Sequence, residues 1–185
     1  MGTYMSRGKR GILAVLLACA MGGPAAEELQ TGQDAPQFQL LDQAGTAHRL
    51  SEYRGRWVVL YFYPKDDTPG CTEEACRFRD DILHLNELGA QVLGVSLDSR
   101  ERHAEFAGKY NLQFPLLSDI DGKVAASYGS LRNLGIMKLA HRHTFIIDPR
   151  GRVAKIYRKV SPKTHSAQVV DDLKVLQRDY AAAAL

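Results

Sequence analysis

The chain has 185 residues, of which 45% are hydrophobic and 24% are charged, and these proportions are typical of one globular domain. They exclude a collagen-like, a disordered and a multi-span membrane protein. The formal net charge of +3 comes from Arg7, Lys9 and Arg10, because the other 21 basic residues equal the 21 acidic ones. The surplus of basic residues therefore gives no reason to expect a nucleic-acid partner.

The N-terminus has the order of a secretory signal, with basic residues at 7–10, an apolar run over 11–20 and small residues up to Ala26. The 10-residue run is well short of the ~20 residues that a membrane-spanning helix needs. The sequence thus predicts a signal peptide over 1–26, a single domain over 27–185 and export, in a bacterium to the periplasm.

Two places in the leader fit signal peptidase, Ala18-Cys19-Ala20 and Gly23-Pro24-Ala25. The residues Leu-Leu-Ala-Cys at 16–19 also resemble the bacterial lipoprotein box, in which the leader ends at 18 and Cys19 becomes the lipidated first residue. We leave open whether Cys19 is discarded or lipidated. We expect a membrane contact only if Cys19 is lipidated.

After a loop at 31–36 the chain alternates strand-like and helix-like patterns, which predicts an α/β architecture. The residues 57–63, Trp-Val-Val-Leu-Tyr-Phe-Tyr, are typical of a strand buried on both faces. Further predicted elements are a turn over 64–70, a helix over 71–88, a strand over 92–97, a helix over 99–110 capped by Ser99, strands over 143–147 and 153–157, and a helix over 166–180.

Cys71 follows the predicted central strand and its turn, at the start of the next helix. Backbone N–H groups and the helix dipole favour the thiolate there and make the sulfur a nucleophile. Thr68 can place its hydroxyl beside the sulfur, while Pro64 and Pro69 restrict the loop. Because glycine precedes Cys71 and glutamates follow at 73 and 74, we expect the position to lie outside the core.

Cys76 lies five residues further along the same predicted helix. In an intact helix the two Cα atoms would be roughly 8 to 9 Å apart, whereas a disulfide closes only up to ~7 Å. If the two cysteines pair, the segment over about 69–79 must unwind and is a two-state element. Spacing alone leaves open whether Cys76 reacts or is an inert helix residue.

The pattern Pro64-x-x-x-Thr68-x-x-Cys71 resembles the signature around the reactive cysteine of the peroxiredoxins. The longer stretch over 62–80 is similar to the Q-type branch, also called bacterioferritin comigratory protein, and the similarity continues over 32–38, 94–96 and 142–148. The resemblance implies a thioredoxin-like fold, with a central mixed β-sheet flanked by helices. It also implies thiol-dependent reduction of hydrogen peroxide and organic hydroperoxides.

The resemblance further assigns roles to five residues. Cys71 would be the peroxidatic cysteine that becomes a sulfenic acid, and Cys76 the resolving cysteine that closes an intramolecular disulfide. Thr68 would hydrogen-bond the peroxide, Pro64 would shield the sulfenate from water, and Arg142 would complete the pocket. An arginine there stabilises negative charge on the sulfur and on the leaving oxygen, but its proximity to Cys71 rests on the resemblance.

The same resemblance implies a thioredoxin-like dithiol as reductant, a monomer, and neither cofactor nor metal. Two alternatives keep the fold but change the function. One is a thiol-disulfide exchange protein, although those commonly carry Cys-x-x-Cys. The other is a copper-binding protein, in which the two cysteines and a histidine form a soft site; His141 and His143 would share one strand face with Arg142 on the other.

Overall fold

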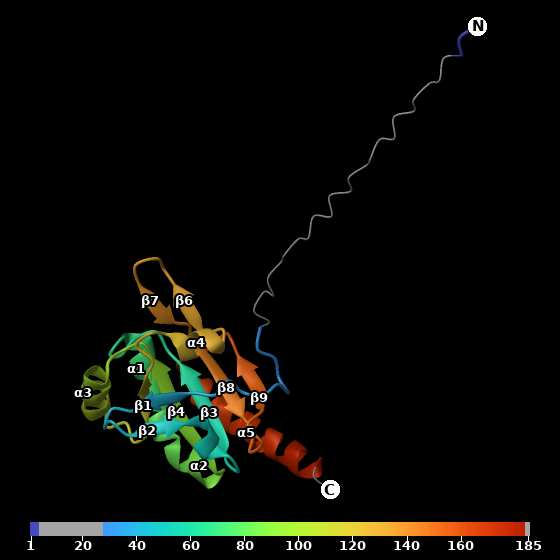
Figure 1. Ribbon diagram of the computed structural model, residues 1–185. Coiled ribbons are helices and arrows are strands. Elements are labelled where there is room, and N and C mark those ends of the chain that lie inside the picture. Colours follow the sequence, from blue (N-terminus) through green and yellow to red (C-terminus); the bar gives the residue numbers. More distant parts are fainter. Residues whose placement is uncertain (4–27, 184–185) are drawn as a thin grey trace.

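The computed structural model describes residues 1–3 and 28–183, so the predicted leader and Cys19 lie outside the described residues. These described residues form nine strands and six helical segments (Figure 1). They are β1 (Gln39–Leu41), β2 (Ala47–Arg49), η1 (Leu50–Tyr53), β3 (Trp57–Phe62), α1 (Pro69–Asp80), α2 (Ile82–Glu87), β4 (Ala90–Ser96), α3 (Arg100–Tyr110), β5 (Leu116–Ser118), α4 (Lys123–Ser127), β6 (Leu131–Asn133), β7 (Lys138–Ala140), β8 (His143–Ile147), β9 (Val153–Tyr157) and α5 (His165–Ala182).

Seven strands form one mixed sheet in the order β2-β1-β5-β4-β3-β8-β9. β4 runs parallel to both β3 and β5, whereas β8 is antiparallel to β3 and to β9. The remaining strands, β6 and β7, form a separate antiparallel hairpin. The predicted α/β architecture with a mixed sheet flanked by helices is therefore confirmed.

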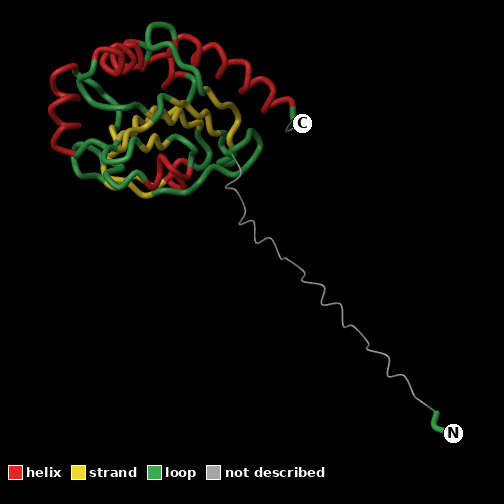
Figure 2. Tube along the Cα trace, turned by 90° about the horizontal axis from the view of Figure 1, so that it is seen from above, coloured by secondary structure: helices red, strands yellow, loops and turns green. Residues whose placement is uncertain are grey.

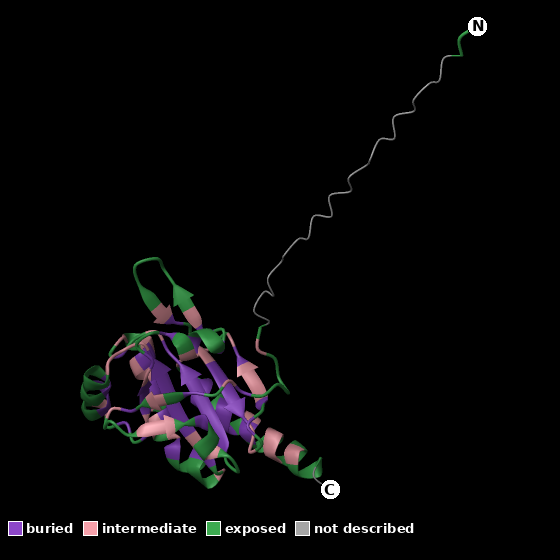
Figure 3. Cartoon of the chain, viewed as in Figure 1, coloured by how far each residue is buried: buried purple, intermediate pink, exposed green. Residues whose placement is uncertain are grey.

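Helices lie on both sides of the sheet (Figure 2), and its strands are largely buried (Figure 3) between two hydrophobic cores. β3 is central because all six of its residues are buried and alternate between the two faces. Val59 and Tyr61 pack with residues of α1, α2, α3 and α5, whereas Leu60 and Phe62 pack with residues of η1 and α4. No helix in the described part of the chain is long and apolar enough to cross a membrane.

The predicted strands over 143–147 and 153–157 agree with β8 and β9, and Ser99 caps α3 by accepting a hydrogen bond from the Arg102 N–H. The prediction of one helix over 71–88 is wrong, because α1 ends at Asp80 and α2 begins at Ile82. At the break, the Ser166 hydroxyl of α5 donates to the Asp81 carboxylate at 2.6 Å. This contact between distant segments favours the turn over a continuous helix.

Strand register brings three connections to one end of the sheet. Phe62 at the end of β3 pairs with His143 at the start of β8, and Thr144 pairs with Tyr157 at the end of β9. The connection from β3 to α1, the β6–β7 hairpin that precedes β8, and the connection from β9 to α5 therefore meet there. We call this the α1 end of the molecule.

Candidate functional site

Cys71 lies at the α1 end, as the third residue of α1. Its exposed fraction is only 2%, and it belongs to the hydrophobic core that includes Tyr61 and Tyr63 of β3. The expectation of a position outside the core is therefore wrong. It relied on the neighbouring glutamates, but α1 packs its first turns against the sheet, and Glu74 is itself buried.

Arg142 is brought to Cys71 from 71 positions away in the chain. It lies in the connection between β7 and β8, and its Nη2 donates to Cys71 Sγ at 3.1 Å. Its Nη1 forms an ion pair with Glu74 Oε2. The guanidinium group thus joins the cysteine sulfur to a buried carboxylate, and the predicted proximity of Arg142 to Cys71 is confirmed.

Glu74 is the site residue that the sequence reasoning missed. Its side chain is 1% exposed, and within the described structure its Oε1 has no hydrogen-bond partner. Burial raises the pKa of Glu74 to about 7 from 4.5, although the Arg142 guanidinium acts in the opposite direction. The available signal was spacing, since a residue three positions after Cys71 shares its helix face.

Glu74→Gln should change how stability depends on pH. Between pH 4.5 and about 7 the unfolded chain has released the Glu74 proton while the folded chain still holds it. The contribution of Glu74 to the free energy of unfolding therefore falls as pH rises across that range, by about 3 kcal/mol, whereas the lowered pKa values of His143 and His165 contribute in the opposite direction. Glu74→Gln removes only the Glu74 contribution, so the variant should gain stability relative to the parent as pH rises. Urea unfolding of both proteins at several pH values measures the difference, and equal pH slopes would contradict a raised pKa at Glu74.

Thr68 and Pro64 lie on the loop that carries Cys71. Thr68 is the residue before α1, and its hydroxyl donates to the Lys65 carbonyl at 3.0 Å. Among the described hydrogen bonds none joins this hydroxyl to the Cys71 sulfur, so the hydroxyl is held by the loop rather than by Sγ. Pro64 is partly exposed and lies two residues after the end of β3.

A buried polar cluster fixes the same loop to α3. Asp66 is 3% exposed, and its carboxylate accepts from the Tyr63 hydroxyl at 2.7 Å and lies 2.7 Å from His103 Nδ1. The Asp66 N–H donates to the Asp98 carboxylate at 2.9 Å. Such a network holds the loop in one conformation because every broken contact would leave a buried polar group unpaired.

Cys76 is partly exposed and, like Cys71, carries a free thiol. Both residues lie within the continuous helix α1. A Cys71–Cys76 disulfide therefore requires the first turns of α1 to unwind.

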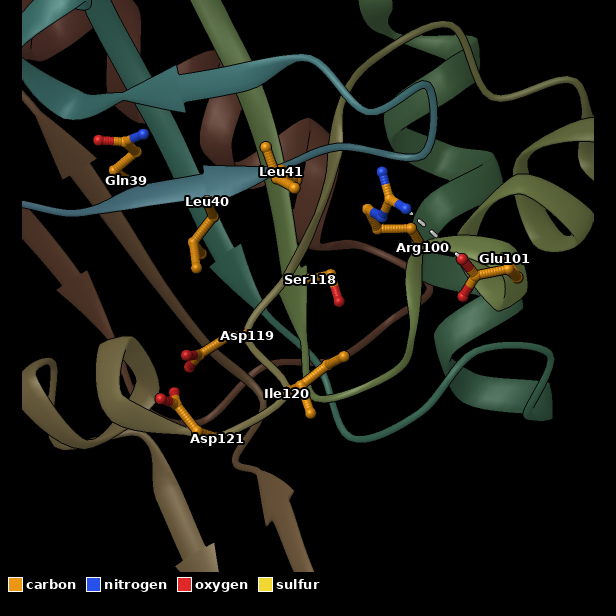
Figure 4. Close-up of a pocket in the computed structure, with 9 residues that line it drawn as sticks. All are labelled: Gln39, Leu40, Leu41, Arg100, Glu101, Ser118, Asp119, Ile120 and Asp121. Carbon is orange, nitrogen blue, oxygen red and sulfur yellow. Dashed lines mark ion pairs between the residues drawn. The ribbon is translucent and has the colours of Figure 1, made fainter.

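A groove of about 620 Å³ runs beside β1 and β5, with Leu41, Ile120 and the Arg100–Glu101 ion pair along it (Figure 4). The groove does not include Cys71 or Arg142 among its lining residues. The described residues contain no group of three or more histidine, cysteine or acidic side chains that could hold a metal ion. His141 and His143 stack with ring centroids 5.2 Å apart, so the two rings lie on one side of the chain, although only His143 belongs to the strand β8.

Residues 31–156 match the AhpC/TSA family. Peroxiredoxin Bcp of Bacillus subtilis is 45% identical over 150 residues, which are 79% of this chain and 96% of that protein. The chloroplastic peroxiredoxin Q of Oryza sativa subsp. japonica is 43% identical over 151 residues, 81% of this chain and 68% of the relative.

Solved structures agree with these sequence matches. The peroxidoxin BcpB of Mycobacterium tuberculosis has a TM-score of 0.76 and 38% identity, covering 80% of this chain and 98% of that one. The bacterioferritin comigratory protein of Xanthomonas campestris, a protein described as having alkyl peroxide reduction activity, has a TM-score of 0.70 and 35% identity. The match covers 75% of this chain and 90% of that one.

Proposed function

The chain belongs to the AhpC/TSA family as a peroxiredoxin of the Bcp or Q type with a thioredoxin-like fold, and from this premise we propose which of its residues perform the reaction. As a member of this family it is an antioxidant oxidoreductase, a thiol-dependent peroxidase that uses a thioredoxin-like reductant. The observation that carries the assignment is the 3.1 Å contact between Arg142 Nη2 and Cys71 Sγ.

Cys71 is the peroxidatic cysteine of the proposed cycle. Its thiolate attacks one oxygen of the hydroperoxide, an S–O bond forms, the O–O bond breaks, and the second oxygen leaves as an alcohol or water after taking up a proton. The products are the Cys71 sulfenic acid and the reduced peroxide. Arg142 stabilises the thiolate and the charge that develops on the leaving oxygen. As the family resemblance implies, Thr68 hydrogen-bonds the peroxide and Pro64 shields the sulfenate from water.

Glu74 holds Arg142 in this arrangement. A guanidinium group presents its donors in one plane, so binding Nη1 to Glu74 fixes the direction in which Nη2 points toward the sulfur. Glu74 is thus a positioning residue that acts through Arg142.

Cys76 is the resolving cysteine of the proposed cycle. Its thiol attacks the Cys71 sulfenic acid, an S–S bond forms and water leaves. The reductant then attacks this disulfide by thiol–disulfide exchange and returns both thiols. Because the pairing requires α1 to unwind near Cys71, the oxidised protein differs from the reduced one in this helix.

Cys76→Ser should separate the two halves of the cycle. The first reaction with peroxide keeps its rate, because Arg142 and Cys71 remain, but the sulfenic acid now persists and further peroxide converts it to sulfinic acid. Stopped-flow kinetics measures the first step, and intact mass after excess peroxide detects the two added oxygen atoms. A Cys76→Ser variant with the parent's dithiol-dependent turnover would remove Cys76 from the mechanism.

The cellular setting is part of the proposal. We propose export by the signal over 1–26 to a periplasmic location, with a domain over 27–185 that acts as a monomer because the resolving cysteine is in the same chain. If Cys19 is lipidated, the leader ends at 18 and the enzyme is tethered to a membrane. An exported enzyme lies outside the cytosolic thioredoxin pool, so its thioredoxin-like donor must act in the same compartment.

The alternatives give no role to the Arg142 contact. A copper site would use the two thiolates with a histidine, but the guanidinium group that donates to Cys71 Sγ competes with a cation for the same sulfur. A thiol-disulfide exchange protein has no need of a donor aimed at a leaving oxygen. Peroxide-dependent formation of a sulfenic acid at Cys71 distinguishes the proposed peroxidase from both.

A further inference from the structure

The β6–β7 hairpin projects from the α1 end and is not part of the main sheet (Figure 1). Its two strands pair in antiparallel register, and the Leu134 N–H donates to the Met137 carbonyl across the turn at 2.8 Å. Gly135 adopts φ +82°, which a glycine accepts without strain, and its N–H donates to Asn133 Oδ1 at 3.1 Å. The turn is therefore a defined structure.

The tip of this hairpin is apolar and exposed (Figure 3). The exposed fractions are 44% for Leu134, 107% for Ile136 and 51% for Met137. Hairpin turns usually carry polar residues, and adjacent exposed apolar side chains mark an interaction site. We call these three residues the apolar tip.

Four cations lie at the same end of the molecule as the apolar tip. They are Arg132 and Lys138 on the hairpin strands and Lys159 and Lys163 on the connection from β9 to α5, and we call them the basic collar. All four are exposed, and none of them takes part in an ion pair of the described residues.

The connection that carries Lys159 and Lys163 lies beside the active site. A Cβ placed on Gly70, next to Cys71, would lie 3.7 Å from Pro162 Cγ and 3.4 Å from Arg142 Nη2. The apolar tip, the basic collar and the approach to Cys71 therefore share one end of the molecule.

The N-terminal segment joins the body at this end as well. Arg158, which follows β9, forms an ion pair with Glu28 at 2.9 Å and donates to the Leu29 carbonyl at 3.2 Å. Cys19 precedes Glu28 by nine positions, and an extended chain of that length spans at most about 30 Å. A lipid on Cys19 would thus keep the α1 end close to a bilayer.

We propose that the apolar tip and the basic collar form a docking surface for an anionic lipid bilayer. Apolar side chains enter the boundary between headgroups and acyl chains, while surrounding lysines and arginines attract anionic headgroups. Docking in this way turns the approach to Cys71 toward hydroperoxides in the membrane. The surface chemistry is independent of the catalytic cycle and stands whether or not Cys19 is lipidated.

The test is a full-length Ile136→Trp variant mixed with vesicles. Trp57, the one natural tryptophan, is buried with 7% exposure, so its emission gives a constant background. Vesicles of equal parts phosphatidylglycerol and phosphatidylcholine should shift the emission of the new tryptophan to the blue, and brominated lipid should quench it. Phosphatidylcholine vesicles should give a much weaker response.

The matched control is Leu83→Trp, because Leu83 is 71% exposed on α2, at the opposite end of the molecule (Figure 1). Its emission should not change when the anionic vesicles are added. Neutralising two collar cations with Arg132→Gln and Lys138→Gln in the Ile136→Trp background should weaken vesicle binding roughly thirtyfold.

Three results would overturn the proposal. Sedimentation of the protein with vesicles while the tryptophan at 136 stays unshifted would mean that the leader alone binds lipid. Equal quenching at 83 and 136 would mean unspecific adsorption. A blue shift at 136 that grows with protein concentration and needs no vesicles would assign the tip to contact between copies. None of these results depends on peroxidase activity, which is measured separately with hydrogen peroxide.

Discussion

Cys71→Ser should reduce the peroxidase activity to the rate of the uncatalysed reaction between peroxide and free dithiol. A serine hydroxyl has the size of the thiol but is a far weaker nucleophile, and no sulfenic acid can form at that position. Stopped-flow measurement of peroxide consumption, with the purified variant and an excess of dithiol, gives the residual rate.

The internal control for Cys71→Ser is the thiol of Cys76. Cys76 remains in the variant and is more exposed than Cys71, so any reactivity of an ordinary surface thiol is still measured. Turnover above that of a simple thiol would place the nucleophile elsewhere and contradict the assignment of Cys71. Circular dichroism of the variant verifies that the core around position 71 is intact.

Arg142→Gln should lower the second-order rate constant with hydrogen peroxide by roughly 100-fold to 1,000-fold, the effect of losing one preorganised donor to developing charge. The guanidinium group donates to Cys71 Sγ, and burial opposes its charge, but Glu74 and Cys71 outweigh burial and raise the pKa of Arg142. Glutamine keeps a donor but no charge.

Arg132→Gln is the matched control for Arg142→Gln. Arg132 lies on β6, in the β6–β7 hairpin that precedes Arg142 in the chain. It is exposed, and the described hydrogen bond to Cys71 Sγ comes from Arg142 instead. The rate with hydrogen peroxide should therefore equal that of the parent. Equal losses in the two variants would mean that general positive charge, rather than the contact with the sulfur, accelerates the reaction.

The sequence carried enough information to place the central strand and the nucleophile. β3 is recognisable because a strand buried on both faces has an unbroken apolar composition, and Cys71 because helix starts favour a thiolate. The position of Arg142 needed the family resemblance, since only strand pairing between Phe62 and His143 brings a residue so distant in the chain to α1.

Other features depend on contacts between distant segments and leave little local signal. The charge of Glu74 suggested exposure, but packing of α1 on the sheet buries it against Arg142. At the helix break, Asp81 binds Ser166 of α5 through its carboxylate, a contact that favours the turn. The short strands β1, β2, β5, β6 and β7 have three residues each, too few for a periodic pattern to be detected.

The measurement that tests the account most directly is the intact mass of the reduced protein before and after one equivalent of hydrogen peroxide, followed by peptide mapping of the cysteines. We expect a rapid loss of two hydrogen atoms and a peptide in which Cys71 is linked to Cys76, which also requires α1 to open. An unchanged mass, or oxidation only at the rate of an ordinary thiol, would contradict the internally resolved peroxidase cycle.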